Sequence, residues 1–243
     1  MMLAMGRAAM LSVVCVCALV LGGCGNDDEV DIKAQYTLAE EAITQQNALA
    51  YLNQYSQESI AQVEEMLRAA RECSAAQTKA LPPAMLMHVI ELRNRCDAKR
   101  LKAMTPEDFT RWRFEEGLLT PDSDHEILVH SIKVRKDYAV MQMGVRDTGR
   151  MRVRGGRRNW VAGAINVAAA VSEGGIIPIE GMTSNFVKQD GWWKIDNVTN
   201  WNETNVWIAQ NAQENQLAVA DFLAAYEKEE YGKLKSNIWS PVK

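Results

Sequence analysis

The residues best suited to chemistry in this chain are arginines that cluster in one short stretch. The sequence RDTGRMRVRGGRR, residues 146–158, is opposed only by Asp147. Guanidinium groups pair with phosphate or carboxylate through two hydrogen bonds, and alternating arginines of a strand project from one face. We therefore predict an anion-binding or partner-binding patch; the alternative is a solvated hairpin arm that avoids edge pairing. The patch consists of Arg150, Arg152, Arg154, Arg157 and Arg158.

Catalytic side chains are harder to find. Of the three histidines, His88 falls on an expected helix, His125 in a loop and His130 in a strand. We find no partner for them at the spacing of a catalytic motif, no Ser/His/Asp set and no phosphate-binding loop. The sequence therefore predicts no catalytic residue, no cofactor and no metal site, and favours a protein that is not an enzyme.

The N-terminal segment indicates where in the cell the protein is located. An apolar run over residues 8–21 is interrupted only by Ser12, and it is shorter than the roughly 20 residues that cross a bilayer. It leads into Leu21-Gly22-Gly23-Cys24, which resembles the lipobox of bacterial lipoproteins. The resemblance implies that residues 1–23 are a cleaved signal peptide and that Cys24 carries the lipid. The alternative is an ordinary secretory signal with a chance cysteine.

Lipidation would place the chain on a membrane of the cell envelope, facing the periplasm. Each CH₂ group buried in the bilayer contributes roughly 0.8 kcal/mol to membrane binding. The two or three acyl chains of such lipoproteins therefore attach the protein stably to the membrane. Gly25 stands where the retention signal of many inner-membrane lipoproteins has Asp, which favours the outer membrane. We expect residues 24–35, which are polar and acidic, to form a flexible tether.

Composition narrows the expected partners. The 31 acidic and 27 basic residues give a formal net charge of −4, which argues against general nucleic-acid binding. We find no second apolar run of membrane-spanning length in the sequence. The expected partners are therefore the membrane, through the lipid anchor, and either an envelope protein or anionic headgroups.

Cys73 and Cys96 are the cysteines left after signal cleavage and lipidation. An exported pair is more often bridged than free, so we predict a disulfide. Simple antiparallel stacking of their helices would offset the two residues by about 10 Å along the axis, whereas bridged Cα atoms lie about 5.5 Å apart. The bridge therefore requires an early helix end or a tilted crossing. Two cysteines without paired histidines do not make a zinc site.

Helical periodicity dominates the first half of the chain. Apolar residues recur at helical spacing from Tyr36 to about Gln77, with Ser56 as a possible internal cap. This stripe predicts core packing; the alternative is a partner-binding or coiled-coil face. Further helices are expected over 83–104 and over 105–117, where Thr105 is the cap.

Strands follow. Residues 126–145 read as strand, turn and strand around Arg135-Lys136-Asp137, and Asp190-Gly191 predicts a second hairpin. Segment 159–173 is ambiguous between helix and strand, and we favour a strand. We expect Trp192 to be covered by a C-terminal helix that runs from about 202 to 231; the alternative is that Trp192 is exposed as a contact.

The order of the expected elements, helices followed by antiparallel strands, resembles that of the nuclear transport factor 2-like superfamily of cystatin-like α+β domains, especially its small bacterial lipoproteins. The resemblance covers about residues 83–198 and is strongest in the phrase F-x-K-x-D-G-x-W-K-I. It implies an α+β fold and little about function, since the superfamily includes enzymes, transport adaptors and secretion components. The matching residues are Phe186, Lys188, Asp190, Gly191, Trp193, Lys194 and Ile195.

We therefore predict an α+β protein: N-terminal helices, a curved and mostly antiparallel sheet packed on helices, and a C-terminal helix. Its expected function is a non-catalytic binding or assembly role on the envelope membrane. The alternatives are a small-molecule-binding or isomerase-like protein that uses the cone of the α+β domain, and a structural subunit of an envelope complex. The expected parts are the signal peptide 1–23, the tether 24–35, a helical segment 36–80, the α+β domain 81–200, and a C-terminal helix and tail 201–243.

Overall fold

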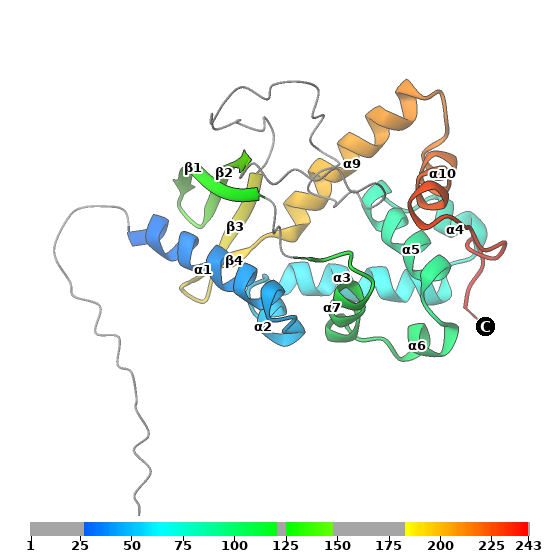
Figure 1. Cartoon of the computed structure of the whole chain (residues 1–243), viewed down its shortest axis with the longest axis horizontal. Coiled ribbons are helices and arrows are strands. Elements are labelled where there is room, and N and C mark those ends of the chain that lie inside the picture. The colour runs from blue at the N-terminus through cyan, green and yellow to red at the C-terminus, as the bar shows by residue number, and fades with distance from the viewer. Residues whose placement is uncertain (1–26, 121–124, 148–182, 243) are drawn as a thin grey trace, which may run out of the picture.

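A computed structural model of the chain describes residues 27–120, 125–147 and 183–242 (Figure 1). Cys24, the arginine patch (Arg150, Arg152, Arg154, Arg157 and Arg158) and segment 159–173 lie outside the described residues. The elements are α1 Asp27–Thr44, α2 Ala48–Leu52, α3 Gln57–Glu72, α4 Ala75–Lys79, α5 Pro83–Arg95, α6 Ala98–Ala103, α7 Pro106–Glu115, β1 His125–Arg135, β2 Tyr138–Asp147, β3 Thr183–Gln189, β4 Trp192–Ile195, α9 Asn197–Glu214 and α10 Val219–Tyr231. The predicted α+β class is confirmed.

The four strands form an open antiparallel sheet in the order β1-β2-β3-β4. Both predicted hairpins are confirmed. Lys136 turns the first with a φ of 52°, and Asp190 and Gly191 turn the second with φ of 52° and 84°. One face of the sheet packs against α1 in an apolar cluster of Ile32, Ala39, Ala139, Met141, Met143, Phe186, Trp193 and Ile195.

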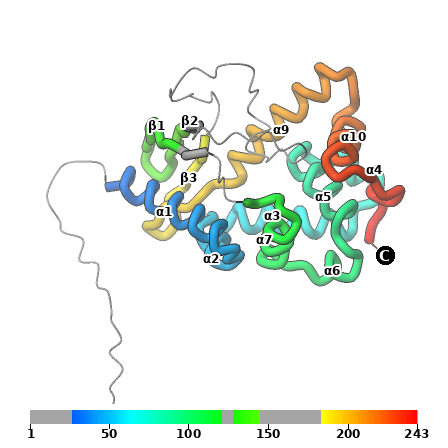
Figure 2. The backbone as a smooth tube through the Cα atoms, viewed as in Figure 1, coloured from blue at the N-terminus to red at the C-terminus, as the bar shows by residue number. Residues whose placement is uncertain are grey.

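Helix α5 is the centre of the helical part. Every residue from 84 to 94 is buried, and α5 packs against α3, α9 and α10 (Figure 2). Val89 and Leu92 belong to the apolar cluster on the α3 side, whereas Leu86 and Ile90 belong to the cluster formed with α9 and α10. In the described part of the chain, no helix is long and apolar enough to cross a membrane.

The predicted tether over 24–35 is wrong for residues 27–35, which belong to α1. Asp27, Asp28 and Glu29 favour the positive N-terminal end of a helix, and Ile32 is fully buried against the sheet. The single helix expected from Tyr36 to Gln77 is also interrupted. Side chains of Asn47, Ser56 and Ser74 each cap a new helix there, which confirms the cap expected at Ser56.

The C-terminal helix expected over 202–231 is two helices. The side chain of Asp196 accepts hydrogen bonds from the backbone N–H groups of Val198 and Thr199, so α9 begins earlier than predicted. The chain then breaks between α9 and α10, where Gln216 has a φ of 56°. Trp192 is 71% exposed, so the expected cover by a C-terminal helix is wrong.

The predicted disulfide is wrong for this structure, because Cys73 and Cys96 are both free. Each follows the last residue of a helix and has contacts of its own. The backbone oxygen of Cys73 accepts a hydrogen bond from Arg93 Nη2 at 2.8 Å, and Cys96 Sγ donates to the backbone oxygen of Asp97 at 3.5 Å. Burial raises the pKa of the Cys96 thiol, which keeps it protonated and unreactive at neutral pH.

Candidate ligand pocket

A cavity of about 220 Å³ lies among α2, α3, α5, α7 and the start of α9. Its walls combine aromatic rings, hydroxyl and amide groups, one arginine and one histidine. The described residues that line it include no aspartate or glutamate. On a chain of net charge −4, the lining is thus unusual in that its one Lys, Arg, Asp or Glu side chain among the described residues is an arginine. The residues that matter below are Tyr51, Tyr55, His88, Phe109, Arg113 and Trp201.

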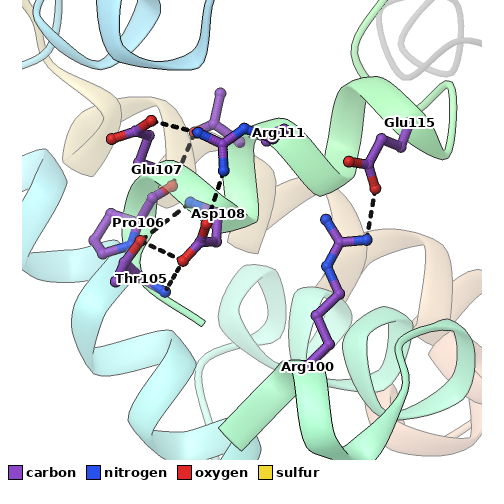
Figure 3. A network of polar contacts seen from close by, with 8 residues as sticks. Arg100, Thr105, Pro106, Glu107, Asp108, Arg111 and Glu115 are labelled. Atoms are coloured by element: carbon purple, nitrogen blue, oxygen red, sulfur yellow. Dashed lines mark hydrogen bonds and ion pairs between the residues drawn. The ribbon is translucent and has the colours of Figure 1, made fainter. Parts of the chain in front are cut away.

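Helix α7 carries Phe109 and Arg113 into the pocket, and its start is fixed by a capping box. Thr105 Oγ1 accepts from the backbone N–H of Asp108 at 3.2 Å, and Asp108 Oδ2 accepts from the backbone N–H of Thr105 at 3.1 Å (Figure 3). The Thr105 hydroxyl, which donates to Asp108 Oδ2 at 2.8 Å, and the Thr105 backbone N–H lower the pKa of Asp108. Figure 3 also shows that α6 is tied to the end of α7 by Arg100 and Glu115, whose Nη1 and Oε2 lie 2.5 Å apart.

Arg113 is the cation of the pocket. Its guanidinium carbon lies 5.7 Å from the ring centroid of Phe109, one helical turn earlier. Its Nε is buried and has no hydrogen-bond partner among the described residues. A buried polar group without a partner costs free energy that a new acceptor can recover. Arg113 is therefore the side chain that an anionic group would stabilise most.

His88 lies on α5 beside the aromatic wall and is held by Glu91. Its Nδ1 is 2.9 Å from Glu91 Oε2, and its ring centroid lies 5.2 Å from that of Trp201 and 6.0 Å from that of Phe109. Burial alone would raise the pKa of Glu91, but the hydrogen bond from His88 and the charges of His88, Arg95 and Arg113 outweigh it and lower that pKa. Because Nδ1 is taken, Nε2 is the ring nitrogen available to a ligand.

Tyr51 and Tyr55 supply hydroxyl groups at the α2 side. The two hydroxyls are hydrogen-bonded to each other, and the rings are 4.9 Å apart. Burial raises the pKa of both phenols, and the neighbouring Tyr51 raises that of Tyr55 further. Both hydroxyls therefore stay protonated at neutral pH. One of them donates to the other, which leaves one O–H to donate a hydrogen bond to a ligand.

Of the histidines considered from the sequence, only His88 reaches the pocket among those whose side chains are described. His130 is exposed on β1 and lies against Gly144, where an added Cβ would come within 2.2 Å of its Nε2. Sequence analysis missed Glu91 as the partner of His88, although residues three apart on a helix are neighbours. It also missed Arg113, whose only signal was its place on a well-capped helix.

Comparison with known protein families, with curated proteins and with solved structures found no match to this chain. Within residues 27–120, 125–147 and 183–242, we find no group of three His, Cys, Asp or Glu side chains that could hold a metal ion.

Replacing Glu91 by Gln should lower the free energy of unfolding at pH 7 by about 2 kcal/mol, since a buried hydrogen bond to a charged group is lost. The pKa of Glu91 is lower in the folded state than its ordinary value of 4.5. The ionised carboxylate therefore stabilises the fold above pH 4.5, and this contribution disappears as the pH falls through the folded-state pKa. Urea unfolding from pH 7 down to pH 3 should show the two proteins converging. Glu64→Gln, at an exposed position, is the control, and a pH-independent difference for Glu91→Gln would contradict the assignment.

Proposed function

We propose that this chain is a lipid-anchored protein of the bacterial cell envelope, on the periplasmic side and on the outer rather than the inner membrane, that binds a small aromatic anion. The lipobox resemblance at Cys24 supports the anchor, and the Asp190-Gly191 hairpin supports a nuclear transport factor 2-like α+β domain. The observation that carries the ligand is the pocket lining, which among the described residues contains Arg113 and His88 but no aspartate or glutamate.

The size and walls of the pocket suggest the ligand class. A volume of about 220 Å³ corresponds to roughly seven water molecules at about 30 Å³ each, which suits one ring with one acidic group. Phe109 and Trp201 offer apolar ring faces, and Arg113 offers a planar donor set that matches a carboxylate. A monocyclic aromatic carboxylate meets all three requirements.

Benzoate should therefore bind, and benzamide, its neutral counterpart of similar shape, should bind at least tenfold more weakly. Arg113→Gln should raise the dissociation constant for benzoate at least tenfold, since a hydrogen bond to a charged group contributes about 1.5–3 kcal/mol. Isothermal titration calorimetry on the purified chain measures both effects.

The matched control is Arg111→Gln on the same helix. Arg111 is exposed and pairs with Glu107 and Asp108, so benzoate affinity should not change. Equal binding of benzoate and benzamide, or equal losses in the two arginine variants, would reject the pocket as an anion site.

The same geometry favours proton transfer as a second candidate. A histidine whose Nδ1 is fixed by a buried carboxylate can take a proton at Nε2, which is the arrangement of a general base. Binding of benzoate does not depend on this role, because benzoate has no acidic C–H bond. A carbon acid with an aromatic ring and a carboxylate, such as phenylpyruvate, is the first substrate to try.

A further inference from the structure

One end of the sheet collects both hairpin turns. The β1–β2 turn contains Lys136 and Asp137, and the β3–β4 turn contains Asp190 and Gly191. The backbone N–H of Lys188 donates to the backbone oxygen of Asp137 at 2.8 Å, which holds the two turns side by side. We name this region, residues 136–137 and 188–193, the hairpin end.

The first turn of α1 is attached to the hairpin end. Asp28 Oδ1 accepts one hydrogen bond from Lys188 Nζ at 2.8 Å and another from the indole Nε1 of Trp193 at 2.9 Å. Figure 1 shows this end of α1 beside the sheet, on the opposite side of the molecule from the C terminus. The point at which the described chain begins is therefore fixed to the hairpin end.

The distance from this point to the proposed lipid is short. Only Gly25 and Asn26 separate Cys24 from Asp27. Three residue steps span at most about 10 Å even when the chain is fully extended. A lipid on Cys24 would thus hold the first turn of α1, and with it the hairpin end, close to the headgroups.

Trp192 is the exposed apolar side chain of this region. It follows the β3–β4 turn directly, and it is 71% exposed, whereas its neighbour Trp193 is buried. An indole with apolar and polar edges is the side chain most typical of the membrane interface. The nearby charges are mixed, with Lys136 against Asp137 and Asp190, so they do not favour anionic lipid in particular.

We propose that the hairpin end faces the bilayer and that Trp192 inserts its indole at the headgroup level of the membrane to which Cys24 is anchored. The proposal rests on the lipid anchor of the proposed function. The partner that covers the exposed indole is the lipid surface itself. Contact through an indole rather than through charge should persist at high ionic strength, unlike attraction to an anionic surface.

The test uses the natively lipidated protein reconstituted into phosphatidylcholine vesicles that contain a brominated phosphatidylcholine, which quenches nearby tryptophans. Part of the fluorescence of the wild-type protein should be quenched, and Trp192→Phe should remove that quenched part. Trp239→Phe is the matched control and should leave the quenching unchanged, because Trp239 is half-buried against the apolar cluster of α5, α9 and α10, away from the hairpin end.

Three outcomes would overturn the proposal, and they can be told apart. If the protein is vesicle-bound but quenching is equal in the wild type and in Trp192→Phe, the orientation is wrong and the anchor stands. If mass spectrometry finds no diacylglycerol on Cys24 and the protein stays off the vesicles, the anchor is wrong and the orientation falls with it. Protection of Trp192 from acrylamide without quenching by bromolipid would show that a protein covers it, and would also overturn the proposal.

Discussion

Replacing Arg93 by Met is expected to lower the free energy of unfolding by about 4 kcal/mol. Arg93 is 5% exposed on the central helix α5. Its guanidinium donates to backbone oxygens at the end of α3, where a helix runs out of its own N–H donors, and also to α4 and to the C-terminal segment. Methionine fills much of the volume but removes every one of these donors. The Ala69 oxygen keeps the Cys73 N–H and the Cys73 oxygen keeps the Thr78 hydroxyl, so the main loss falls on the oxygens of Ala70 and Ile238. The acceptors are the backbone oxygens of Ala69, Ala70, Cys73 and Ile238 and the hydroxyl of Thr78.

Urea unfolding monitored by circular dichroism measures the loss, and Arg68→Met is the control. Arg68 lies on α3 with a 62% exposed side chain and a 3.7 Å surface ion pair to Glu65, so its loss should cost at most about 0.5 kcal/mol. If the two methionine variants were equally stable, Arg93 would not hold α3, α4 and the C-terminal segment together.

Replacing Glu227 by Ala should cost about 3 kcal/mol, because it leaves a cation buried without its partner. Glu227 on α10 is 3% exposed. Its Oε2 lies 2.5 Å from Arg95 Nη2, its Oε1 lies 2.7 Å from Arg95 Nε, and Asn94 Nδ2 donates to Oε1 at 2.7 Å. These contacts join α10 to the end of α5, so the loss should appear as early unfolding of the C-terminal helices.

The double variant Arg95→Met with Glu227→Leu removes both charges. It therefore distinguishes the free-energy contribution of the ion pair from the cost of leaving Arg95 buried without a partner. A buried ion pair that is replaced as a whole by apolar residues often costs little, so the double variant should be more stable than Glu227→Ala. Thermal unfolding of the three proteins provides the comparison. A double variant that is less stable than Glu227→Ala would mean that the pair itself is strongly stabilising.

Local sequence patterns predicted those helices and hairpins whose ends are fixed by nearby capping or turn residues. Thr105 and Asp108 close a capping box where a helix was expected, and Asp190-Gly191 turns its hairpin. The start of α1 was missed because its acidic first turn reads as a solvated tether. The burial of Ile32 against sheet residues such as Ala139 and Phe186, more than 100 residues later in the chain, is the contact that the local pattern does not show.

The pocket could be predicted only in part. The His88–Glu91 pair is local, since the two residues are one helical turn apart, and it could have been read from the sequence. The contact between His88 and Trp201 joins residues on α5 and α9, and no periodicity links such positions. Arg113 is a candidate anion-binding residue because no acid is found among the described lining residues. That lining is formed by five packed helices, so the sequence around Arg113 could not predict it.

The most direct test of the ligand proposal is a crystal structure of the chain grown with 4-bromobenzoate. Anomalous scattering from bromine locates the ligand independently of how the density is interpreted. A bromine peak inside the pocket between Arg113 and Trp201, absent from crystals of Arg113→Gln, is the expected result. No peak in the pocket at a concentration that saturates the calorimetric titration, or a peak on another surface alone, would contradict it.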